Sequence, residues 1–146
     1  MRLKCALFLS AFTLLSSCAS NTANFSGLIA PSTGKAVIYI YRVDLTVRHV
    51  EVAPNVRVNY ESIGPLTISG YYRVEVEPGP TQVALYTLDR GRDTYWRTAK
   101  DAIVNLNLAP NSIHFVQLSL DRGFFSFREI SRDVALQSLP DLYLLN

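Results

Sequence analysis

The chain has 146 residues and a formal net charge of +2, and this excess of positive charge belongs to its N-terminal end. Without Arg2 and Lys4, 12 of the 14 basic residues remain and balance the 12 acidic ones. A balanced chain has no broad basic surface for nucleic-acid phosphates, so we expect no nucleic-acid partner. The length is typical of one compact domain with its own core.

Residues 1–17 predict a lipoprotein signal peptide. A basic start is followed by an apolar, uncharged run, Cys5–Leu15, which has the length of a signal-peptide core and is too short for a mature spanning helix. Two serines then lead into Cys18, as in a bacterial lipobox. We expect Cys18 to be the lipidation site, with palmitate-type acyl chains, and the preceding peptide to be removed.

Two alternatives exist for the same residues. An ordinary secretory signal could be cleaved near Ala19, after the small residues that flank Cys18, and an uncleaved membrane anchor would need a longer apolar run. The lipobox explains the cysteines best, because removal of the leader leaves Cys18 as the only cysteine. A disulfide within one chain is then excluded, although an exported protein could form one.

Composition divides the mature chain into a tether and one domain. Residues 18–34 are mostly small and polar and include the turn formers Pro31 to Gly34, so we expect a flexible tether there. Residues 35–146 predict a single domain, an all-β sandwich of about seven to eight mainly antiparallel strands with one short C-terminal helix. Turn residues separate apolar segments at the spacing typical of sandwiches and barrels.

The first half of this domain predicts three strand regions. Ala36–Arg42 is apolar on both faces, as in a central strand. Val50–Val58 is interrupted by Pro54, which indicates two short strands or an edge strand with a bulge. Ile68–Glu77 alternates most clearly, and one face carries Tyr72, Val74 and Val76 while the other carries Tyr71, Arg73, Glu75 and Glu77.

The second half predicts two hairpins, a further strand and a helix. The hairpins are 81–88 with 94–98, and 102–108 with 112–120, and the further strand is 124–130. Ser131 could cap a helix whose apolar stripe is Val134, Ala135, Leu136 and Leu139, and Pro140 would end it. The apolar residues 141–146 should pack on the domain or form a last strand, and a partner-binding tail is the alternative.

Several segments resemble one known family. They are Gly34–Arg42, Gly70-Tyr71-Tyr72, Val74–Gly79, and a hairpin from Val104–Leu106 to Phe115–Gln117. Together they are similar to the domain-of-unknown-function family 2846, which consists of small exported bacterial domains, often lipoproteins. The likeness covers about Gly34 to Leu139 and departs at Asn59–Ser62, where the family tends to have an Asp-Gly-like turn. It implies a β-sandwich and transfers no catalytic residues.

Few residues suggest catalysis or metal binding. His49 and His114 are the only histidines, and we expect His49 to be solvated and His114 to be structural within its strand. Metal sites draw on several clustered ligands, and no nucleophile elbow or phosphate-binding glycine loop is present. We therefore expect no enzyme activity, no catalytic residue, no metal and no cofactor.

Three features could serve binding. Tyr95, Trp96 and Arg97 follow a loop that contains Arg92, and aromatic and arginine side chains are frequent at binding hot spots. A strand with Tyr95 and Trp96 must turn one of them inward, which favours Trp96 as a core residue. The second feature is the face of Tyr71, Arg73, Glu75 and Glu77, which could also be simply solvated. The third is a free sheet edge that accepts a partner strand, and Pro54 suggests that its own segment is peripheral.

The sequence thus predicts a non-enzymatic interaction or structural module. It would be anchored in the membrane through its N-terminal lipid, with an envelope protein as partner. Ala19 after Cys18, in place of an aspartate sorting signal, favours the outer membrane, facing the periplasm. The alternative is a lipoprotein that binds glycan or lipid headgroups through Trp96 and its Tyr and Arg neighbours.

Overall fold

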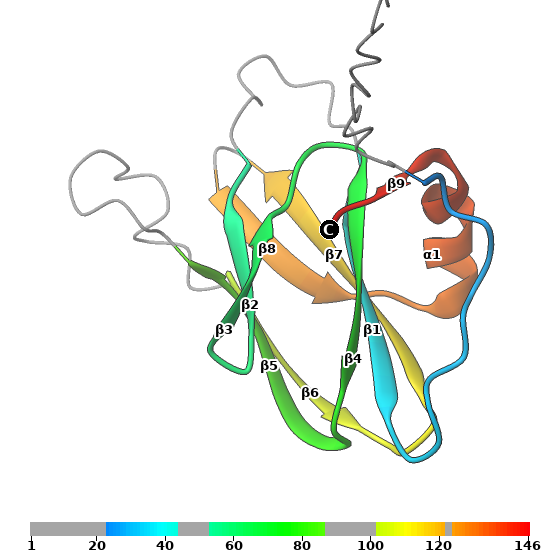
Figure 1. Cartoon of the computed structure of the whole chain (residues 1–146). Coiled ribbons are helices and arrows are strands. Elements are labelled where there is room, and N and C mark those ends of the chain that lie inside the picture. The colour runs from blue at the N-terminus through cyan, green and yellow to red at the C-terminus, as the bar shows by residue number, and fades with distance from the viewer. Residues whose placement is uncertain (1–22, 44–52, 87–101, 122–123) are drawn as a thin grey trace, which may run out of the picture.

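The computed structural model describes residues 23–43, 53–86, 102–121 and 124–146. These residues form nine strands, one short α-helix and a 3-10 turn, and the strands are arranged in two sheets (Figure 1). The predicted all-β class, with a sandwich-like pair of sheets and one short C-terminal helix, is confirmed.

The two sheets combine strands that are distant in the sequence. In spatial order, the first contains β8 (Phe124–Glu129), β7 (Ile113–Asp121), β1 (Ala36–Arg42), β4 (Gly70–Val76) and β9 (Tyr143–Leu144). The second contains β3 (Glu61–Pro65), β2 (Asn55–Val58), β5 (Gly79–Tyr86) and β6 (Ile103–Leu108). Neighbouring strands are antiparallel except for the parallel pairs β1–β7 and β4–β9.

Strand β1 is the central strand predicted from its apolar sequence, and every one of its residues is buried. Successive side chains of a strand point to opposite faces. Ile38 and Ile40 therefore join the core between the two sheets, whereas Tyr39 and Tyr41 join a second core on the outer face. Helix α1 (Arg132–Ser138) and the N-terminal segment cover that outer face, on the side away from β2, β3 and β5 (Figure 1).

The prediction of a flexible tether is wrong for residues 23–34, which pack on the domain. The Phe25 ring meets the rings of Tyr39 and Tyr71 edge-on, with centroids 6.1 and 5.8 Å apart. The Ile29 N–H donates a 2.9 Å hydrogen bond to the Tyr39 hydroxyl. Composition suggested a tether because apolar residues are few here, but Phe25 and Leu28 suffice to cover the outer aromatic core. Residues 18–22 lie outside the described residues.

The β2–β3 hairpin corrects the prediction that Val50–Val58 is peripheral. Strand β2 lies between β3 and β5, and Pro54 precedes its first residue, so no ladder bond is lost. The predicted bulge is present, since the β2–β3 register shifts between Val56 and Arg57. Strand β3 was not predicted, because a two-residue turn with positive φ at both Asn59 and Tyr60 (49° and 71°) replaces the usual Asn-Gly signal.

The predicted hairpin of 102–108 with 112–120 is also wrong, although both segments are strands. Strand β6 pairs with β5 in one sheet, and β7 pairs with β1 in the other. The turn between them is held to the start of β1, because the Asn111 N–H donates to the Lys35 carbonyl and the Gly34 N–H donates to Asn111 Oδ1. These bonds lie at the start of the parallel ladder between β1 and β7. The predicted arm 94–98 lies outside the described residues.

The predicted C-terminal helix and last strand are present, with two departures from the prediction. Helix α1 has Ser131 at its N-cap position, without a side-chain capping bond, and a 3-10 turn (Leu139–Asp141) containing Pro140 follows the helix. Ala135 and Leu139 are buried, but Val134 is 48% exposed, so the apolar stripe is narrower than expected. The last residues form β9. Among the described residues, no helix is long and apolar enough to span a membrane.

Candidate functional site

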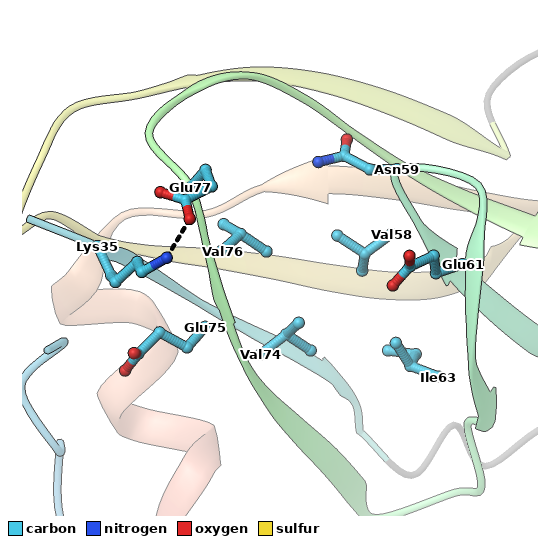
Figure 2. Close-up of a pocket in the computed structure, with 9 residues that line it drawn as sticks. All are labelled: Lys35, Val58, Asn59, Glu61, Ile63, Val74, Glu75, Val76 and Glu77. Atoms are coloured by element: carbon cyan, nitrogen blue, oxygen red, sulfur yellow. Dashed lines mark hydrogen bonds and ion pairs between the residues drawn. The ribbon is translucent and has the colours of Figure 1, made fainter.

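A cavity of about 410 Å³ opens between β4 and the β2–β3 hairpin (Figure 2). It lies within the range of roughly 300–1,000 Å³ that is usual for ligand pockets. Its lining consists of four aliphatic side chains, one amide and four charged groups: Val58, Ile63, Val74, Val76, Asn59, Lys35, Glu61, Glu75 and Glu77.

The apolar lining is an extension of the core between the sheets. Val74 and Val76 lie on the inward face of β4, as the sequence alternation predicted, and they pack against the main core while remaining half-buried. Ile63 also packs on that core, next to the bulge between β2 and β3, and bulges redirect side chains in this way. Figure 2 shows these side chains between β4 and the hairpin.

The charged groups stand around this apolar lining. Lys35 Nζ forms an ion pair with Glu77 Oε1, and the Glu75 carboxylate accepts a 3.1 Å bond from the Ser32 N–H. Hydrogen bonds from the Ser32 side chain and backbone, and then from Arg73, hold the pKa of Glu75 below its ordinary value of 4.5. Glu61 is exposed and has no ion-pair or hydrogen-bond partner among the described residues. Glu75 also forms a 3.4 Å ion pair with Arg73 Nη2. With Glu77 paired to Lys35, the Glu61 carboxylate leaves the rim with one net negative charge.

One edge of β4 borders the cavity without a partner strand. Strand β9 pairs only with Gly70 and Tyr71, and the Leu145 N–H donates to the Tyr71 carbonyl. Main-chain groups alternate sides along a strand, so those of Arg73 and Glu75 face the same edge as those of Tyr71. No described strand pairs with them there. On the other lateral side of the sandwich, β6 contacts β8.

The far end of this edge is closed by a contact between β4 and β3. The Tyr72 hydroxyl donates a 3.0 Å hydrogen bond to the Pro65 carbonyl. Gly64, with φ of 116°, lies so close that a Cβ atom there would be 2.5 Å from the Tyr72 hydroxyl oxygen. Strands β4 and β3 are therefore in direct contact at Tyr72, next to the cavity-lining residues Ile63 and Val74.

The predicted lipidation site and the predicted Trp96 cluster cannot be placed against this cavity. Cys18, Arg92, Tyr95, Trp96 and Arg97 all lie outside the described residues, as does His49. The cavity itself was not predicted, because its lining comes from β2, β3 and β4 together, and β3 gave no recognisable pattern. The alternation of 68–77 was the only available signal, and it identified Val74 and Val76 as inward-facing.

The face of Tyr71, Arg73, Glu75 and Glu77 is not simply solvated, as one interpretation had it. Tyr71 is only 6% exposed and belongs to the outer core. The Arg73 guanidinium donates to the carbonyls of Ile29 and Ala30, at 3.4 and 3.0 Å. The N-terminal segment thus covers half of this face, and of its four residues only Glu75 and Glu77 are exposed.

A second polar cluster surrounds His114. Its Nδ1 lies 2.7 Å from Glu129 Oε1 and its Nε2 lies 3.0 Å from Ser112 Oγ, which is the order of groups in a hydrolase triad. However, Ser112 Oγ also lies 2.6 Å from the Ala109 carbonyl, to which it donates. Its single proton is therefore not directed at the imidazole. These contacts join the turn before β7 to β8, in agreement with the structural role expected for His114.

Among the described residues, no group of three or more His, Cys, Asp or Glu side chains could hold a metal ion. No family model matches the chain, and no curated protein matches it. The resemblance to the domain-of-unknown-function family 2846 therefore stays a prediction from the sequence.

Proposed function

We propose that this chain is a lipoprotein of a bacterial envelope, anchored through Cys18, that binds a protein partner and is not an enzyme. The observation that supports it most directly is the open edge of β4 beside an apolar cavity. An unpaired edge can accept a strand from another chain, and an adjoining apolar cavity provides a place for that strand's side chains. The leader ending at Cys18 supports export and lipidation.

The lipid would hold the domain at the membrane surface. A single acyl chain binds a bilayer only marginally, whereas two or more give stable anchoring. We propose the outer membrane, facing the periplasm, because Ala19 follows Cys18 in place of an aspartate. The mature protein should then stay with the membrane fraction through a high-salt wash, which releases proteins held only by charge.

Replacing Cys18 with alanine tests the anchoring. Cys18→Ala should remove the acyl mass from the intact protein, block cleavage before residue 18 and move any processed chain to the soluble fraction. Cys5→Ala is the matched control, since Cys5 lies within the leader and its loss should leave mass and membrane association unchanged. An unchanged intact mass in Cys18→Ala would refute the lipid anchor.

A further inference from the structure

We infer that the partner binds the open edge of β4 as an extended strand whose inward-facing positions carry aliphatic residues and at least one Lys or Arg. This inference rests on the proposed function and specifies its partner. It follows from three properties of the site: the free main-chain groups of β4, the apolar lining of the cavity and the acidic rim.

The main chain of β4 provides the first property. The N–H and C=O groups of Arg73 and Glu75 face the open edge, beyond the point where β9 stops pairing at Tyr71. A strand laid there would form up to about four main-chain hydrogen bonds, which provide affinity without selecting a sequence. This pairing would continue the first sheet past β9.

The cavity provides the second property. Side chains of an added strand alternate between the two faces of the sheet, so every second residue would enter the space between the sheets. There it would meet Val74 and Val76 from β4 and Ile63 from β3, all half-buried. Small or medium aliphatic side chains fit a volume of about 410 Å³ that is lined in this way.

The rim provides the third property, because its charges fit a basic segment. Glu75 is kept ionised by Ser32 and Arg73, Glu77 is paired with Lys35, and Glu61 has no partner among the described residues. In Figure 2 the Glu61 carboxylate lies beside Val58, on the hairpin side of the cavity. A Lys or Arg of the incoming strand can pair with Glu61, whereas an acidic segment would be repelled.

The test is selection of a random heptapeptide library on the full-length protein, purified from membranes in detergent. The selected peptides should carry aliphatic residues and a Lys or Arg at every second position, on one face of the strand, and they should shift the amide NMR signals of Arg73 and Glu75. Glu61→Gln should weaken their binding roughly two- to fivefold, as expected for an exposed ion pair. Asp133→Asn, an exposed acid on α1, is the matched control and should leave binding unchanged.

Two changes test main-chain pairing itself. Methylating every second peptide nitrogen of a selected peptide, on the edge that pairs, should abolish binding. Glu75→Pro removes the outward N–H of Glu75 at an edge position where proline is tolerated, and it should weaken binding more than Glu75→Ala does.

Any of four results would overturn the inference: no enriched peptide, enriched acidic peptides, binding that survives methylation of each peptide edge in turn, or a concentration-dependent dimer that competes with the peptides. The last would identify a second copy of this chain as the occupant of the edge. None of these results bears on the lipid anchor, which the Cys18→Ala mass measurement tests separately.

Discussion

The hydroxyl of Tyr72 donates a 3.0 Å hydrogen bond to the carbonyl oxygen of Pro65, and this bond joins β4 of one sheet to β3 of the other. Burial raises the pKa of the Tyr72 hydroxyl above its ordinary value of 10.0. The group therefore remains protonated and able to donate at neutral pH.

Removal of this hydroxyl should lower stability modestly. Tyr72→Phe keeps the ring in the core and loses only the bond to Pro65, which should cost about 1 kcal/mol of unfolding free energy. Urea denaturation followed by circular dichroism measures the change. Tyr72→Asp should cost far more, since it places an unpaired charge in the core, and near-normal stability of that variant would mean that Tyr72 is not a core residue.

Gly64 and Tyr72 should be energetically coupled. Gly64→Ala places a Cβ 2.5 Å from the Tyr72 hydroxyl oxygen and adds strain at a φ of 116°, so we expect a loss of about 2 kcal/mol or more. In the Tyr72→Phe background the nearest ring atom is 3.4 Å away, and the loss should be smaller. If the stability losses of Gly64→Ala and Tyr72→Phe are additive in the double mutant, Gly64 does not lie as close to the Tyr72 hydroxyl as the structure places it.

Tyr60 should be a site where glycine stabilises the protein. Tyr60 has φ of 71° and is 77% exposed, so its backbone is strained while its side chain contributes little packing. Tyr60→Gly should raise the unfolding free energy by up to about 1 kcal/mol. Tyr60→Ala keeps the positive φ and serves as the control. If Tyr60→Gly has a lower unfolding free energy than Tyr60→Ala, the two-residue turn is not strained at position 60.

The N-terminal segment should contribute to stability through Phe25. The half-buried ring contacts Tyr39 and Tyr71, so Phe25→Ala should cost about 2 kcal/mol, less than for a fully buried ring. Limited proteolysis should also cut residues 23–34 faster in this variant, because the anchor of the segment is lost. A change below about 0.5 kcal/mol, with unchanged proteolysis, would show that the segment does not stabilise the domain.

Protonation of Glu75 should make the folded protein less stable in acid. Its pKa is lowered in the folded state by Ser32 and Arg73. The ionised carboxylate therefore stabilises the fold above the ordinary pKa of a glutamate, and this stabilisation is lost as the pH falls through the lowered pKa. Urea midpoints measured from about pH 6 to about pH 3 should therefore fall more steeply in the wild type than in Glu75→Gln. Ser32→Ala should reproduce part of this flattening. Identical slopes in all three proteins would exclude the interaction.

The sequence predicted individual strands better than it predicted their partners. Period-two alternation depends on which side of a strand is apolar, so the inward face of Tyr72, Val74 and Val76 could be read directly. The pairing of β7 with β1 is accompanied by bonds from Asn111 to Gly34 and Lys35, which are distant from it in the sequence. No local pattern encodes such a long-range contact.

Two further features could not be predicted from the sequence, for different reasons. Strand β3 follows a turn in which Tyr60 adopts a conformation that usually requires glycine or asparagine. Arg42 is fully buried at the end of β1, with its guanidinium 5.1 Å from the centroid of the Phe125 ring. Residue type alone indicates exposure for such a cation, and only the tertiary structure brings Phe125 beneath it.

The measurement that tests the account most directly is photo-crosslinking in intact cells from the cavity rim, across from the open edge of β4. A photoreactive residue would replace Glu61 at the cavity rim, and the same residue at Asp133 on α1 would be the control. The account predicts one defined set of envelope proteins crosslinked from position 61 and not from position 133. The same products from both positions, or none from position 61, would contradict partner binding at this edge.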